Sequence, residues 1–158
     1  MDSLDFSKLE TQLLTFNDEC HYWLHGNISL LEQLLFQLIV GYLVDSSANL
    51  LKGDPVFQLV LDKKTIVSQA SISPFWDRIS ETTLSQFQTL NQILLDKVRV
   101  KRNSIELIID LDSTHSDIFG HQEESTYNAH YRTNGYHPLI VFDGLIGDFL
   151  KAELHSGI

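Results

Sequence analysis

The spacing of hydrophobic and polar residues divides the chain into two regions with different predicted structures. Between residues 30 and 43, apolar pairs recur every four residues, which predicts an α-helix with a wide apolar face. Asp54 followed by Pro55 predicts another helix start, because Asp caps free backbone N–H groups and Pro is tolerated in the first turn. We therefore expect residues 1–103 to form a helical region.

A long helix is predicted over residues 83–100, where apolar residues such as Leu84 and Leu90 recur at spacings of three and four. Thr83 and Gln86 have the spacing of a capping box at its start. Short helices separated by capped turns are similar to a DNA-binding helix-turn-helix bundle. A plain helical packing domain is the alternative.

The end of this helix carries the only basic cluster in the sequence, made of Lys97, Arg99, Lys101 and Arg102. Such cations can bind the phosphates of DNA. They can equally complement the negative end of the helix dipole. The whole chain is acidic, with 21 acidic residues against 11 basic ones and a net charge of −10, so DNA binding would depend on this local cluster.

Residues 104–158 have the pattern of β-strands. Apolar side chains alternate from Ile105 to Leu111, which predicts a strand. Asn134-Gly135 lies between two extended stretches and predicts a tight turn. Pro138 cannot donate a ladder hydrogen bond, so we expect it at a strand start, an edge or a bulge. The predicted fold class is α+β.

The remaining composition excludes several classes of protein. A single cysteine, Cys20, excludes a disulfide framework and a cysteine-rich zinc fold. The first residues lack the basic and apolar segments of a signal peptide. The most apolar run, residues 28–44, contains Glu32 and two glutamines and is barely long enough to span a bilayer. We therefore expect a cytoplasmic protein without a membrane segment.

Asp110 and Asp112, at the end of the predicted strand, are the strongest candidates for chemistry. A period of two places both carboxylates on one face, with Cα atoms about 6.6 Å apart. Carboxylate oxygens are ligands that Mg²⁺ prefers. Ordinary turn chemistry at a strand end is the non-functional alternative.

Two chemistries fit this pair of carboxylates taken alone. The segment from Asp110 to Thr114 reads D-x-D-x-T, as in phosphatases of the haloacid-dehalogenase type, which use an aspartyl nucleophile. The other chemistry is two-metal nucleotidyl transfer, in which the first strand of a ribonuclease-H-like sheet carries a metal-binding Asp.

The residues that follow the pair favour nucleotidyl transfer. IIDLDST is followed by GHQEESTYNAHY and NGYHPLIVFDG, and this string resembles the DDE transposases of bacterial insertion sequences. The resemblance covers roughly residues 40–158. The matching residues beyond the Asp pair are Thr114, Gly120, Gln122, Tyr127, Asn128, His130, Tyr131, Gly135, Tyr136, His137, Pro138 and Leu139.

The resemblance implies a fold, a cofactor and partners. Residues 104–158 would begin a ribonuclease-H-like catalytic domain with its first antiparallel strands. Mg²⁺ would be the cofactor, transposon-end DNA the partner, and a homo-oligomer the assembly. Asp112 to His115 matches the D-x-T-H pattern of related integrases, so Asp112 is the first candidate for the leading member of the catalytic Asp-Asp-Glu triad. Asp110 is the second candidate, and both are candidate metal ligands. His130 and His137 either line the site or serve as structural histidines.

In the family, the second Asp and the Glu of the triad lie further along the chain than the last residue here. We therefore expect a truncated, N-terminal part of a transposase that is catalytically incomplete by itself. Two alternatives stay open. One is a D-x-D-x-T phosphatase, which requires a parallel α/β sheet, and the strand pattern downstream argues against it. The other is a non-enzymatic module that binds DNA ends or a partner protein.

Overall fold

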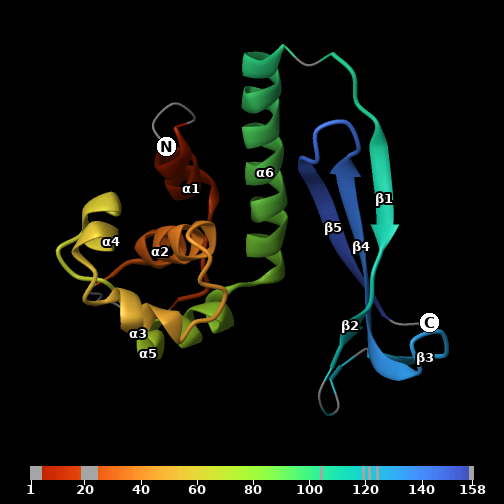
Figure 1. Cartoon of the computed structure of the whole chain (residues 1–158), viewed down its shortest axis with the longest axis horizontal. Helices are drawn as coiled ribbons and strands as arrows, with labels where there is room; N and C mark the ends of the chain where they lie inside the picture. Colours follow the sequence, from red (N-terminus) through yellow and green to blue (C-terminus); the bar gives the residue numbers. More distant parts are fainter. Residues whose placement is uncertain are drawn as a thin grey trace. The chain divides into compact units, whose positions relative to one another are not determined.

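The computed structural model describes residues 5–18, 25–103, 105–118, 120, 122–123 and 125–156. These residues form an α+β structure of helices followed by a five-stranded antiparallel sheet (Figure 1). The chain divides into two compact units, residues 1–90 and residues 91–158. The helices are α1 (Phe6–Leu13), α2 (Asn27–Ile39), α3 (Ser47–Leu51), α4 (Pro55–Val60), α5 (Gln69–Ile72), the 3₁₀ helix η2 (Ser73–Arg78) and α6 (Glu81–Arg102).

Helix α2 is confirmed, but it ends at Ile39 instead of continuing to residue 43. Gly41 stops it, because its φ of 92° lies in the left-handed region. The Gly41 N–H donates to the Leu38 carbonyl, and the Tyr42 N–H donates to the Gln37 carbonyl. This pair of bonds is a Schellman motif, which ends a helix even where the apolar spacing continues. The apolar side chains that α2 buries are Leu30, Leu31 and Leu34.

A buried glutamine joins α2 to the segment that follows α4. The Gln33 side chain is fully buried. Its amide nitrogen donates to the Val67 carbonyl at 2.9 Å, and its amide oxygen accepts from the Val67 N–H at 2.8 Å. The glutamine thereby satisfies both backbone groups of a buried residue that has no helix or strand partner.

Gln33→Leu is expected to lower the free energy of unfolding by about 2–4 kcal/mol, because it leaves the two backbone groups of Val67 buried without partners. Denaturant unfolding of the whole chain, followed by circular dichroism, measures this loss. The control Gln12→Leu changes an exposed position of α1 and should cost less than about 0.5 kcal/mol. Equal stability of the two variants would contradict the prediction.

Helix α6 begins at Glu81, and its cap differs from the predicted one. The Ser80 N–H donates to the Thr83 hydroxyl and the Thr83 N–H donates to the Ser80 hydroxyl, both at 3.2 Å. Gln86 instead accepts from the Thr15 N–H at 2.8 Å. The predicted Thr83–Gln86 capping box is therefore wrong, because Ser80 provides the same chemistry three residues earlier.

Two further helix predictions have different outcomes. The cap at Asp54 is confirmed, since its carboxylate accepts from the N–H groups of Val56 and Phe57. In α6, Leu90 is buried as the periodicity predicts, whereas Leu84 is 55% exposed. None of the helices among the described residues has the length and apolarity needed to cross a membrane.

The sheet is organised around one long strand (Figure 1). Strand β4 pairs antiparallel with all four other strands. Gly135 of β4 pairs with β2 on one side and β3 on the other, and Val141 likewise pairs with β1 and β5. The strands are β1 (Ile109–Ser113), β2 (Ser116–Asp117), β3 (Thr126–Asn128), β4 (Thr133–Asp143) and β5 (Phe149–Ser156).

The tight turn predicted at Asn134-Gly135 is wrong, because both residues lie inside β4. The β3–β4 turn occupies residues 129–132, and Asn128 builds it. The Asn128 side-chain oxygen accepts from the N–H groups of residues 130 and 131, and its carbonyl accepts from the Arg132 N–H at 2.7 Å. Arg132 takes a left-handed φ of 57°. An Asx turn at the earlier asparagine thus replaces the Asn-Gly turn.

Pro138 lies in the middle of β4, opposite Leu154 of β5, and not at a strand start, an edge or a bulge. Its carbonyl accepts from the Thr114 N–H at 3.1 Å. In an extended residue the nitrogen faces the same neighbour as the carbonyl. That neighbour is Thr114, which lies between the end of β1 and the start of β2, so the N–H that proline lacks falls at an interruption of the ladder.

The strand predicted from Ile105 begins only at Ile109. Ile105 itself is 92% exposed, and the apolar β1 residues Ile109 and Leu111 are 64% and 59% exposed. β1 pairs with β4 along one side only among the described strands. The alternation of apolar side chains therefore begins at Ile105, four residues before the paired strand begins at Ile109.

Candidate catalytic carboxylates on the first strand

Asp110 and Asp112 stand on one face of β1. In the register, Asp110 lies opposite Phe142 and Asp112 opposite Ile140 of β4. Directly opposed residues of an antiparallel pair share a face, so the two carboxylates border a half-buried apolar strip of the central strand. Both aspartates are exposed. This arrangement presents two hard oxygen ligands side by side to anything that approaches that face.

A third aspartate near the pair, Asp143, has a structural role instead. Asp143 is fully buried and lies opposite Ile109, on the other face from Asp110. One carboxylate oxygen accepts from the Leu145 N–H at 3.0 Å, and the other binds the Arg99 guanidinium at 2.7 Å. Asp143 therefore fixes the β4–β5 turn, and both of its carboxylate oxygens are engaged, one by a backbone N–H and one by a guanidinium.

The end of β1 that carries Asp110 is held by the same turn. The Gly144 N–H donates to the Ile108 carbonyl at 2.7 Å. A side chain on Gly144 would begin 3.4 Å from Cβ of Asp110. The turn is thus hydrogen-bonded to the residue that precedes β1, and its glycine lies beside Asp110.

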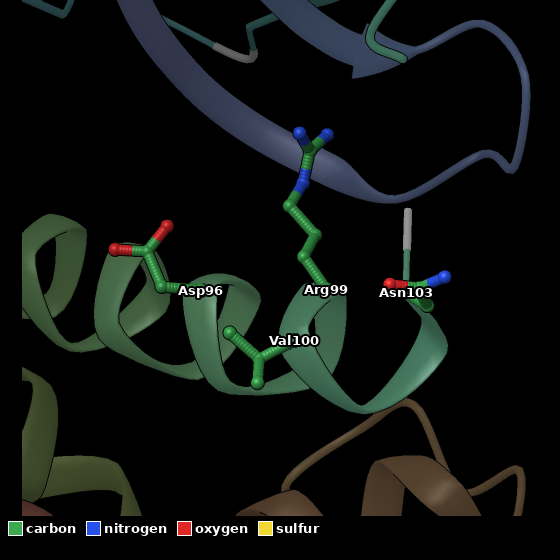
Figure 2. A pocket seen from close by; sticks show the side chains of 4 residues that line it. All are labelled: Asp96, Arg99, Val100 and Asn103. Atoms are coloured by element: carbon green, nitrogen blue, oxygen red, sulfur yellow. The ribbon is translucent and has the colours of Figure 1, made fainter. Parts of the chain in front are cut away.

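The basic cluster at the end of α6 is partly engaged within its own unit. Arg99 binds the buried Asp143, and Arg102 binds Asp148 with two contacts of 3.0 and 2.9 Å. Figure 2 shows the Arg99 side chain pointing from α6 toward the sheet. A shallow pocket beside it is lined by Asp96, Arg99, Val100 and Asn103 and includes neither candidate carboxylate.

Several of the motif residues gather in a second cluster around Tyr131. The Tyr131 ring stacks on His115 at a centroid distance of 4.6 Å and meets His130 edge-on at 4.8 Å. His137 lies 5.2 Å from His115 and hydrogen-bonds to the Asn128 side chain. The register puts His137 on the face of Leu139, which is opposite to the face of the Asp pair.

In the sequence, His115 stands out only as the last residue of the D-x-T-H pattern. In the structure it contacts Tyr131, His137 and Asp117. Its side chain is 6% exposed, and Nε2 lies 3.1 Å from the Asp117 carboxylate. Its Nδ1 is buried without a hydrogen-bond partner. The hydrophobic pattern does not signal this position, because the partners of His115 lie in the β3–β4 turn and in strands β2 and β4.

The other motif residues surround the two clusters. Gly120 has a left-handed φ of 84°, and the Gln122 carbonyl accepts from the Ser125 hydroxyl. Tyr127 is 58% exposed, while the Tyr136 hydroxyl donates to the Glu123 carbonyl. These contacts lie among the described residues between β2 and β4, so local folding of the sheet accounts for these motif residues.

The donor set suits a hard divalent cation but is small. Within the described ranges, no group of three or more His, Cys, Asp or Glu side chains is placed to hold a metal ion. Asp110 and Asp112 offer two carboxylates, whereas Mg²⁺ takes six oxygen ligands, including water. The pair fits one side of such a site.

Comparison with known proteins gives one family. The family model described as "Transposase DDE domain group 1" matches residues 1–158. No curated protein and no solved structure matches the chain. The antiparallel sheet also differs from the parallel sheet that the phosphatase alternative requires.

Proposed function

The chain belongs to the transposase DDE domain family, group 1, and on that basis we propose that its sheet contributes catalytic carboxylates to DNA cleavage and strand transfer. The observation that carries the proposal is the position of Asp110 and Asp112, exposed on one face of the strand that opens the sheet. The antiparallel strands β1, β4 and β5 would be the first strands of a ribonuclease-H-like sheet.

Asp112 and Asp110 would hold Mg²⁺ through their carboxylate oxygens. When bound, the ion supplies Lewis-acid activation of water and of a DNA 3′-hydroxyl for attack on a phosphodiester. The chain's own contribution is to fix two negative charges on a paired strand, at a face that DNA can reach. Further ligands would come from outside this pair, so we expect the 158-residue chain alone not to cleave DNA.

We further propose that the helical region, residues 1–103, contacts the transposon end. The basic end of α6 offers Lys97, Arg99, Lys101 and Arg102, which favours contact with phosphates. Arg102 is half exposed even while it binds Asp148, so a phosphate can share its guanidinium. The resemblance also implies that the working form is a homo-oligomer.

Metal binding by the carboxylate strand can be tested on the chain as it is. Mn²⁺ prefers the same oxygen ligands as Mg²⁺ and broadens the NMR signals of nearby nuclei. We expect selective broadening of the backbone amides around residues 110–112 at millimolar Mn²⁺. The double variant Asp110→Asn/Asp112→Asn should lose it, because both charges are removed while size is kept.

The control is Asp62→Asn/Asp77→Asn, which removes the same charge from two exposed residues of the other unit. This control should retain the broadening around residues 110–112. Broadening that follows net charge equally in both double variants, or that centres on another acidic group, would overturn the assignment of the metal ligands.

A further inference from the structure

The first helix carries a carboxyl group in an unusual environment. Glu10 of α1 is fully buried, and neither of its carboxylate oxygens has a hydrogen-bond partner. A buried charge without a partner is strongly unfavourable, whereas a protonated carboxyl group is only a buried polar group. The geometry alone therefore favours the neutral form of Glu10 in the folded unit.

The charged groups around Glu10 do not supply a partner. Glu32 of α2 accepts from the Ser7 hydroxyl of α1 at 3.0 Å and pairs with Lys63 at 3.4 Å. Lys63 also donates to the Ser29 carbonyl at 2.7 Å. The only described cation near Glu10 is thus directed at another carboxylate and at a backbone oxygen.

The expected pKa shifts of these groups agree with the packing. Burial, followed by repulsion from Glu32, raises the pKa of Glu10 to about 7, and Lys63 acts in the opposite direction. Burial also lowers the pKa of Lys63, with Glu32 and then Glu10 opposing. His25 lies in the field of the same lysine, and burial and Lys63 lower its pKa.

We propose that the packing of α1 onto the helical unit is controlled by a proton, so that α1 stays closed while the Glu10 carboxyl group is neutral and opens once it is ionised. Closure rests on the Ser7–Glu32 contact between α1 and α2 and on burial of the Glu10 side chain. When α1 separates from the rest of the unit, water can solvate the ionised Glu10 carboxylate, which is buried in the closed form. The device is separate from the carboxylate strand and does not depend on the proposed function.

The direction and range of the effect follow from the two states. In the open form Glu10 has an ordinary pKa near 4.5, and in the closed form it has a pKa of about 7. Between these values the closed form binds the extra proton, so raising the pH favours opening by up to about tenfold per pH unit. Above the closed-form pKa both forms are ionised, and the equilibrium no longer changes.

Amide hydrogen exchange on the whole chain measures this opening. After correction for the intrinsic exchange rate, protection of the Leu14 amide, which donates to the Glu10 carbonyl, should fall more than about tenfold between pH 5 and pH 7 and then level off. Glu10→Gln keeps the size of the side chain but cannot ionise, so its protection should not vary over this range. Glu81→Gln, at an exposed acidic residue of the same unit, should behave like the original chain.

A second measurement applies to the unmodified chain and does not depend on any variant folding. The side-chain carboxyl carbon of Glu10, followed by NMR, should titrate with a midpoint well above 4.5 and in the same range as the loss of protection. A midpoint at or below 5 would overturn the proposal. So would a fall in protection that persists in Glu10→Gln.

Discussion

Asp112→Asn is expected to reduce DNA cleavage by more than about 100-fold in an assembly that contains this chain together with the remaining triad carboxylates. Replacement of groups that only support a metal ligand already costs 10–100-fold, and loss of a ligand's charge should cost at least as much. The substitution keeps the size of the side chain. Position 112 is exposed and paired only through its backbone, so folding should be unaffected.

The measurement is cleavage of a terminal-repeat duplex, with DNA-end binding recorded in parallel. Binding should change little in Asp112→Asn, and Asp110→Asn should have an equal or milder effect on cleavage. Asp62→Asn is the matched control for the loss of one charge. Full activity of Asp112→Asn, combined with an inactive Asp110→Asn, would move the leading catalytic position to Asp110.

Gly135→Ala is expected to destabilise the sheet unit by about 3 kcal/mol or more. Its Cβ would lie 2.3 Å from the Ser116 carbonyl oxygen and 2.6 Å from the nearest atom of the His115 ring. The carbonyl belongs to backbone that is paired with β4, so it cannot move away without breaking the β2–β4 ladder. Ring displacement would also disturb the stack on Tyr131.

Thermal unfolding and the NMR shifts of residues 115–117 would report this damage. Gly53→Ala is the matched control, because a Cβ there meets no atom within 4 Å. We expect the control to unfold close to the original midpoint. A Gly135→Ala chain that is as stable as the control, with unchanged shifts at His115, would contradict the crowding seen at this glycine.

The regular parts of the structure were predictable because they depend on short-range patterns. The period of four around Leu30, the Asp54 cap and the alternation that ends in β1 are each encoded within a few neighbouring residues. The common face of Asp110 and Asp112 follows from the geometry of any strand. Family membership, too, was visible in the residues that follow the pair.

The wrong predictions concern positions whose conformation depends on residues far away in the sequence. Asn128 and Asn134 are both turn-forming residues, but only Asn128 has a neighbour in the left-handed conformation four positions later. A glycine is needed at position 135 because the carbonyl of Ser116 in β2, 19 residues earlier in the sequence, passes close to it. Pro138 is tolerated inside β4 because it faces the interruption of the ladder between the end of β1 and the start of β2.

Strand β4 takes part in every ladder of the sheet, and this places a constraint on its length. An added or deleted residue within β4 would turn all side chains on one side of the change to the opposite face. The same change would shift the partners of two strands while leaving the other two in place. In relatives of this protein, we therefore expect β4 to vary by substitution and not by insertion or deletion.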